Sequence, residues 1–173
     1  MPEYSIELAR ARDIPALPAI ELAAAQLLAG YAPASILAES TDLQTLGVAQ
    51  AAGRLWAALA DDIPVGFALV EMLSDNHAHL AEIDVHPLHG RRGLGTRLMR
   101  AACEWAARSG CAELTLTTYR AIPWNMPFYA RLGFVELPRT EQTLELMAIV
   151  QDEAARGLAP ELRVAMRYQE TRS

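Results

Sequence analysis

A short run rich in glycine and arginine is the part of the sequence best suited to chemistry. Residues 90–96 read Gly-Arg-Arg-Gly-Leu-Gly-Thr, after a strand-like stretch that ends at Pro87. The N–H groups at a helix start have no intrahelical partner, and the helix dipole adds partial positive charge there. Glycines let that backbone approach a ligand, and guanidinium groups bind phosphate oxygens. The run predicts a phosphate or diphosphate site; a surface turn with solvated arginines is the alternative.

Two common phosphate-binding loops do not fit this run. A dinucleotide fingerprint needs a third glycine where Leu98 stands. A Walker loop needs a Gly-Lys-Ser/Thr sequence, which the chain lacks. A nucleotide-binding enzyme of another class is therefore disfavoured.

Two motifs together resemble the GCN5-related N-acetyltransferase (GNAT) family. That family binds acetyl-CoA with Gln/Arg-x-x-Gly-x-Gly/Ala, after a strand that ends in Val-x-Pro. Residues 85–87 and 92–96 are similar to these two features. Residues 128–134, Phe-Tyr-Ala-Arg-Leu-Gly-Phe, resemble the family's Phe-Tyr-x-x-x-Gly-Phe. The resemblance covers about residues 63–137.

This resemblance implies an α/β (α+β) mixed-sheet fold with splayed central parallel strands, and acetyl-CoA as cosubstrate. Gly90 departs from the family, which usually has Gln or Arg there, so the diphosphate would depend more on main-chain amides and neighbouring arginines. The N–H of Val85 or a neighbour would polarise the thioester carbonyl. The implied cofactor-binding residues of the strand and loop are Ile83, Val85, Arg91, Arg92, Gly93, Leu94, Gly95 and Thr96.

The resemblance also suggests a catalytic acid, and the sequence offers a base. Tyr129 matches the family tyrosine that protonates the coenzyme A thiolate; packing without a kinetic role is the alternative. Glu82 is the candidate general base, acting through water, because Glu82 and Asp84 share one face of a strand. The alternative is that both carboxylates form the solvated face of that strand. His77 and His79 lie just upstream.

Asn125 and the cysteines are harder to interpret. The family often places a cofactor-binding asparagine six residues before the Phe of Phe-Tyr, where this chain has Ile122; Asn125 stands three before Phe128. A cofactor contact by Asn125 and a helix cap both remain open. Cys103 and Cys111 have neither disulfide nor metal spacing and are expected to pack. No cluster of His, Cys and carboxylates has metal-ligand spacing.

The hydrophobic patterning predicts one mixed α/β domain over residues 1–173. Asp13 is expected to cap a helix that ends near Gly30. Strands are expected at residues 4–8, 54–60, 65–73, 78–85, 113–118, 134–137 and 163–168. Further helices are expected at residues 43–52, 95–109, 127–132 and 140–156, with a loop or short helix at 31–40. The order strand, helix, strand over residues 78–118 predicts a parallel crossover.

Composition limits the partners. The net charge is 15 − 21 = −6 and the pI about 5.2, which argues against a nucleic-acid binder. An acidic protein favours cationic partners such as amines, although ordinary solubility also explains it. The sequence shows neither a signal peptide nor a membrane-spanning stretch, so a cytoplasmic protein without membrane association is expected.

The sequence therefore predicts an N-acetyltransferase in which a primary amine attacks acetyl-CoA directly, without an acyl-enzyme. The acceptor is a small-molecule or peptide amine that the sequence does not identify. The family's habit suggests a homodimer. The main alternative is a non-catalytic acyl-CoA-binding sensor or interaction module.

Overall fold

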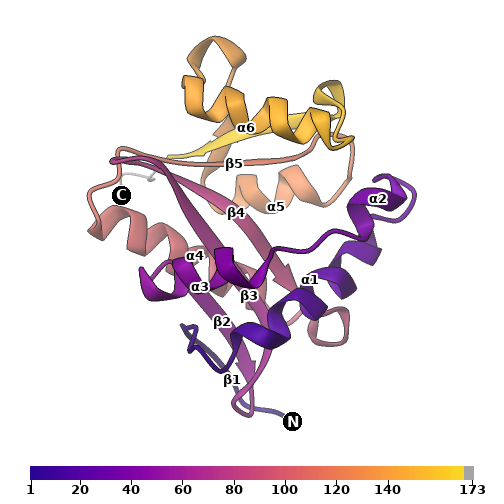
Figure 1. The fold of residues 1–173 in the computed structure, drawn as a ribbon, viewed down its shortest axis with the longest axis vertical. Coiled ribbons are helices and arrows are strands. Elements are labelled where there is room, and N and C mark those ends of the chain that lie inside the picture. The colour runs from indigo at the N-terminus through magenta and orange to yellow at the C-terminus, as the bar shows by residue number, and fades with distance from the viewer. Residues whose placement is uncertain (170–173) are drawn as a thin grey trace.

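A mixed β-sheet forms the centre of the protein (Figure 1). The structure, a computed structural model, describes residues 1–169. Within them the sheet has seven strands in the order β1-β2-β3-β4-β5-β7-β6. The strands are β1 Tyr4–Leu8, β2 Leu55–Ala60, β3 Ile63–Ser74, β4 His77–Val85, β5 Glu113–Tyr119, β6 Phe134–Glu136 and β7 Arg163–Tyr168. The α-helices are α1 Leu17–Ala25, α2 Ala34–Leu37, α3 Leu43–Ala51, α4 Leu94–Arg108, α5 Asn125–Arg131 and α6 Leu144–Ala155.

Helices cover both faces of the sheet. Helix α4 packs across β1 to β5 on one face, where Leu94, Leu98 and Ala102 repeat every four residues and are buried. Helices α1 and α3 pack on the opposite face, over β2, β3 and β4, and Leu17 and Leu46 are fully buried there. The expected strand–helix–strand crossover is confirmed: β4, α4 and β5 follow in that order, and β4 and β5 are parallel.

The N-terminal helix differs from the expectation. The stretch from Asp13 to Gly30 is divided into a 3-10 turn at Ile14–Ala16, the helix α1, and a second 3-10 turn at Gln26–Leu28. Asp13 makes no side-chain cap bond, so the predicted cap is wrong. Its carboxylate instead accepts hydrogen bonds from the backbone N–H and the guanidinium of Arg10.

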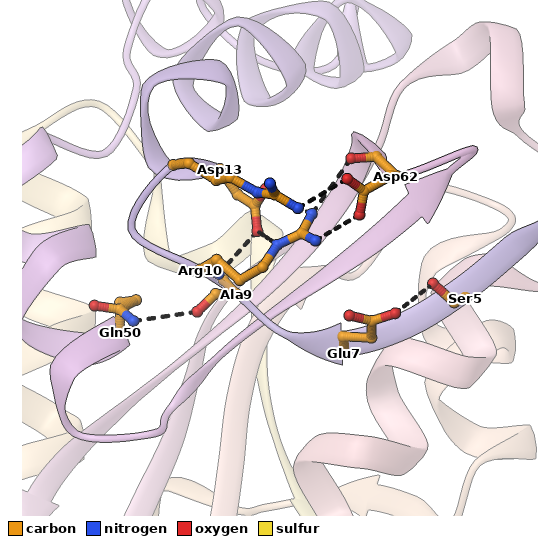
Figure 2. Close-up of polar contacts among 8 residues, drawn as sticks. Ser5, Glu7, Ala9, Arg10, Asp13, Gln50 and Asp62 are labelled. Atoms are coloured by element: carbon orange, nitrogen blue, oxygen red, sulfur yellow. Dashed lines mark hydrogen bonds and ion pairs between the residues drawn. The ribbon is translucent and has the colours of Figure 1, made fainter.

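This Arg10–Asp13 pair belongs to a polar network that ties the chain after β1 to the β2–β3 turn (Figure 2). Asp61 and Asp62 form the two-residue turn with φ of 47° and 69°, the left-handed geometry of a tight hairpin. Arg10 and Arg12 both donate to the Asp62 carboxylate, at 2.5 and 2.8 Å. Two arginines that follow β1 therefore fix the β2–β3 turn through Asp62.

Other element boundaries shift by a few residues for local reasons. Helix α6 begins at Leu144 rather than near residue 140, because the Thr143 hydroxyl accepts a hydrogen bond from the N–H of Leu146 and caps it. Helix α5 begins at Asn125, two residues earlier than expected. The four-residue helix α2 lies within the segment expected as a loop or short helix.

Candidate active site

A gap opens in the sheet between β4 and β5. The two strands pair in parallel only at their starts, where His77 to His79 face Glu113 to Thr115. Beyond that point β4 remains paired with β3 up to Val85, while β5 pairs with β7. Figure 1 shows the two strands diverging from a common corner of the sheet. The main chain of β4 toward Val85 therefore presents an edge that no strand of the described residues occupies, as the splayed fold requires.

Three buried side chains mark the point of divergence. The Thr115 hydroxyl lies 2.8 Å from His77 Nε2 and 2.9 Å from His79 Nδ1. Burial lowers the pKa of His79 to about 4, with a smaller contribution from His77, so its ring is neutral at neutral pH. Because a neutral imidazole both donates and accepts, the hydroxyl and the rings satisfy one another without a charge.

A β-bulge at Ala81 sets the direction of the side chains that follow. Leu80 pairs with Val70 on β3 but Glu82 pairs with Leu69, so one extra residue lies on β4. The bulge reverses the alternation of faces, and Glu82 and Asp84 point to the face covered by α1 and α3. His79, upstream of the bulge, points to that face as well.

The start of α4 offers a run of unpaired main-chain donors. None of the N–H groups from Arg91 to Thr96 has a hydrogen-bond partner among residues 1–169. The first main-chain hydrogen bond of the helix is donated by the N–H of Arg97 to the carbonyl of Gly93. Gly93 has φ +74°, which glycine adopts without strain, and the turn it makes starts the helix.

The side chains of the loop divide into two groups. Arg91 and Arg92 are exposed, and the Arg92 guanidinium lies 5.6 Å from the centre of the Tyr4 ring. Leu94 is 1% exposed and packs in the core, so it offers a ligand only its N–H. Two exposed cations beside unpaired amides fit a diphosphate.

Helix α5 packs against this loop. A Cβ on Gly95 would lie 3.4 Å from Cζ of Phe128, so a glycine keeps α5 close to the start of α4. Asn125 is the first residue of α5, and its side-chain amide donates to the Thr118 hydroxyl at 3.0 Å. Trp124 occupies the cap position, so the interpretation of Asn125 as a cap is wrong.

The alternative interpretation, that Glu82 and Asp84 form the solvated face of the strand, is wrong. Both are partly buried, and Asp84 Oδ2 is fully enclosed without a hydrogen-bond partner within the described residues. Burial, with a smaller effect of Asp84, raises the pKa of Glu82 well above its ordinary value. Burial and then the charge of Glu21 raise the pKa of Asp84 to about 8. A carboxyl group with a pKa of about 8, as in Asp84, holds and releases a proton near neutral pH, and the raised pKa of Glu82 favours its protonated form.

Tyr129 shares the electrostatic environment of these carboxyl groups. Its ring is half-buried against the α4 core, and its hydroxyl makes no hydrogen bond in the described part of the chain. Burial and then the charges of Asp84 and Glu82 raise its pKa above the ordinary value. The phenol therefore keeps its proton at neutral pH and has it available to donate.

Sequence reasoning missed two residues of this region, Glu21 and Tyr119. Glu21 lies on α1, is 8% exposed, and accepts hydrogen bonds from the N–H and hydroxyl of Thr41. It stands four residues after Leu17 on the buried stripe of the helix, and a charged residue at an apolar position was the available signal. Tyr119 lies at the end of β5, 5% exposed; nothing in the strand pattern marked it.

A sequence model of the Acetyltransferase (GNAT) family matches residues 22–134. The chain belongs to that family. The recognised motifs fall at the places where the structure has the gap and the unpaired loop, so the family expectation of splayed central strands is confirmed.

Solved structures of acetyltransferases share the fold. The PaiA N-acetyltransferase of Thermoplasma acidophilum in complex with coenzyme A is 16% identical with a TM-score of 0.73, covering 96% of this chain and 99% of that chain. The ribosomal-protein-S18-alanine N-acetyltransferase of Escherichia coli is 19% identical with a TM-score of 0.65, covering 99% of both. YncA of Salmonella typhimurium, a putative acetyltransferase with acetyl-CoA, is 16% identical with a TM-score of 0.68, covering 98% of this chain and 95% of that chain.

Two structural features are absent from the described residues. Residues 1–169 contain no helix that is long and apolar enough to cross a membrane. The same residues contain no group of three or more His, Cys, Asp or Glu side chains arranged to hold a metal ion.

Proposed function

We propose that the protein transfers the acetyl group of acetyl-CoA to a primary amine, by direct attack within a ternary complex. The observation that carries the proposal is the run of unpaired N–H groups from Arg91 to Thr96, placed at the start of α4 beside the open edge of β4. The solved structures with coenzyme A or acetyl-CoA share this fold, which supports acetyl-CoA as the cosubstrate.

The residues of the loop and of β4 have distinct roles toward the cosubstrate. Main-chain N–H groups from Arg91 to Thr96, with the two arginines, hold the diphosphate. The main chain of Ile83 and Val85 on the open edge pairs with the pantetheine arm. The N–H of Val85 polarises the thioester carbonyl by donating to its oxygen as negative charge develops there. Asn125 is the remaining proposed contact.

Glu82 and Tyr129 move the protons. Glu82, whose pKa is raised, takes a proton from the acceptor ammonium through water, which frees the nitrogen lone pair. The nitrogen then forms a bond to the carbonyl carbon and the carbon–sulfur bond breaks. Tyr129 gives its proton to the departing sulfur, which leaves as the CoA thiol. The nitrogen, now bonded to the acetyl carbon, loses its second proton, and this proton returns Tyr129 to the phenol form. Acetyl-CoA supplies the activated acetyl group.

The wider assignments follow from the same proposal. The acceptor is a small-molecule or peptide amine, and residues 1–173 form a single acetyltransferase domain. No nucleic acid or membrane takes part. A homodimer is proposed from family habit, and a cytoplasmic location is proposed as the default. Cys103 has no place in the reaction because burial raises the pKa of its thiol to about 12.

Ligand binding and turnover test this proposal. Acetyl-CoA and CoA are expected to raise Tm, whereas NAD and ATP are expected to leave it unchanged, because only the first pair fits both the loop and the open edge. An amine library is then screened by release of the CoA thiol. Binding of CoA without turnover of any amine would identify a sensor or interaction module, and preferential binding of NAD or ATP would contradict the cosubstrate assignment.

A further inference from the structure

The two strands that flank the gap present their side chains at matching levels. Counting from the last parallel pair and allowing for the bulge, Glu82 on β4 lies level with Thr117 on β5. Asp84 lies level with Tyr119 in the same way. Alternation places all four side chains on the face covered by α1 and α6, opposite α4. They therefore line one space, on the far side of the gap from the α4 loop.

Tyr119 is the unsatisfied group on the β5 side of this space. Its side chain is 5% exposed, and its hydroxyl is fully buried with no hydrogen-bond partner among residues 1–169. The Arg163 guanidinium lies over its ring, 4.8 Å from the centroid, and leaves the hydroxyl unbonded. Thr117, in contrast, donates to Glu153. A buried hydroxyl without a partner destabilises the folded protein, so a ligand that bonds it gains affinity.

Asp84 is the unsatisfied group on the β4 side. Its Oδ2 atom is buried and has no hydrogen-bond partner in the described part of the chain. A carboxylate oxygen and a phenol oxygen are both acceptors, and by register Asp84 and Tyr119 lie at one level of the two strands that flank the gap. A ligand group with several N–H donors satisfies both.

Carboxyl groups give this space a capacity for negative charge. Burial raises the pKa of Asp84 to about 8, and an ammonium group bound beside it favours loss of that proton. Glu21 reaches the space from α1, and its charge acts on both Glu82 and Asp84. Cations also act there: Arg163 from β7 and Arg156 near the end of α6 both act on Glu82. Each of these arginines is already paired with a glutamate, Arg163 with Glu153 and Arg156 with Glu39. Both cations are therefore engaged elsewhere, and the carboxyl groups of Glu21 and Asp84 are left to pair with a cationic ligand.

We propose that this space binds a second ammonium group of the acceptor, so that the enzyme acts on short aliphatic diamines. Asp84 Oδ2 and Tyr119 Oη accept the N–H bonds of that ammonium, and Glu21 adds negative charge. Glu82 serves the amine that is acetylated. Residues two apart on a strand are about 6.6 Å apart, which is about the span of an extended diamine of four or five carbons. The inference rests on the proposed function and names its substrate class.

Matched acceptors of one chain length test the inference. Initial rates of CoA release are measured with diaminobutane that carries an amine at each end, with butylamine, and with aminobutanoate, whose second end is a carboxylate. After correction for its two equivalent ends, diaminobutane is expected to exceed butylamine in kcat/KM by about tenfold or more, and aminobutanoate is expected to be the poorest.

Two variants locate the effect. Glu21→Gln removes one negative charge and Tyr119→Phe removes the unpaired hydroxyl, and each is expected to lower the ratio of diaminobutane to butylamine. Tyr119→Phe should not lower Tm in the absence of ligand, because the hydroxyl has no partner to lose. Glu7→Gln, at an exposed position on β1, is the matched control and should keep the wild-type ratio.

The outcomes separate this inference from the proposed function. Equal kcat/KM for diaminobutane and butylamine, or preference for aminobutanoate, overturns the diamine site while transfer stands. If no amine is acetylated, the proposed function fails. The diamine site is then tested by ligand binding alone. A larger Tm increase with diaminobutane than with butylamine on the CoA-loaded protein, lost in Tyr119→Phe, supports the site; equal increases overturn it.

Discussion

At the scale of single residues, the acid and the base are set by burial and by one another's charge. Glu82, Asp84 and Tyr129 all have raised pKa values, and each owes its shift first to burial. The pKa of Asp84 is raised to about 8, and the pKa of the Tyr129 phenol is raised above its already higher ordinary value, which is the order that acid–base chemistry needs. The sequence could suggest these residues. Their protonation at neutral pH depends on burial, which only the packed structure shows.

Removing the proposed acid gives the first prediction. Tyr129→Phe keeps the ring that packs against the α4 core but removes the proton given to the sulfur. We expect kcat to fall by about a hundredfold, with little change in the KM for acetyl-CoA. Steady-state rates over a pH series measure this. An unchanged kcat across pH would show that Tyr129 only packs.

The proposed base gives a pH prediction. A base with a raised pKa becomes active as pH rises through that pKa, so the wild-type rate should climb with pH before the acceptor's own deprotonation adds to it. In Glu82→Gln the lower step should disappear and the step due to the acceptor should remain. Because Glu82 and Asp84 interact, the fitted pKa belongs to the pair. A profile identical to that of the wild type would remove Glu82 from the mechanism.

Asp84 links the site to stability. Its pKa is about 8 in the folded protein, against about 3.9 in an unfolded chain. Between these values the folded state holds a proton that the unfolded state lacks, so the free energy of unfolding falls as pH rises toward 8. Asp84→Asn removes this titration. Its Tm relative to the wild type should therefore rise as pH increases from about 5 to 8, whereas a difference that is constant with pH would contradict the assigned pKa.

At the scale of elements, periodicity predicted the strands and helices well but not how they are joined. The alternation in residues 78–85 predicted β4, yet a regular strand places His79 and Glu82 on opposite faces. The bulge at Ala81 brings both side chains to one face. No residue type in that stretch predicts a bulge. At Asp13 the residue type did predict a feature, a helix cap, but the structure does not form it. The Asp13 carboxylate pairs with the Arg10 guanidinium instead.

The start of α4 is testable with a matched pair of glycines. Gly93 and Gly110 have φ of +74° and +72°, and an added Cβ meets nothing within 4 Å at either place. Alanine at either position should cost about 1–2 kcal/mol and lower Tm by about 2–8 °C. Only Gly93→Ala should also weaken CoA, because only Gly93 shapes the loop of unpaired amides. Calorimetric titration of CoA into both variants measures this; equal affinities would contradict the loop's role.

At the scale of the whole molecule, the proposed cosubstrate and acceptor sites lie on opposite faces of one gap. Helices α4 and α5 and the loop of unpaired amides lie on one face, and α1 with the segment that follows it lies on the other. That segment is tied to the far side of the gap by an ion pair between Glu39 and Arg156 and by an edge-on contact of Tyr31 with Trp124. Such long-range contacts were beyond sequence reasoning, because Glu39 and Arg156 are 117 residues apart.

The central claim is that main-chain amides at the start of α4 hold a diphosphate, and amide NMR tests it most directly. In a titration of ¹⁵N-labelled protein with CoA, the resonances of residues 91–96 should shift strongly and saturate with the binding curve. Pantetheine, which lacks the diphosphate, should shift residues of β4 but not this group. If CoA binds while the amides of residues 91–96 stay in place, the diphosphate lies elsewhere and the account fails.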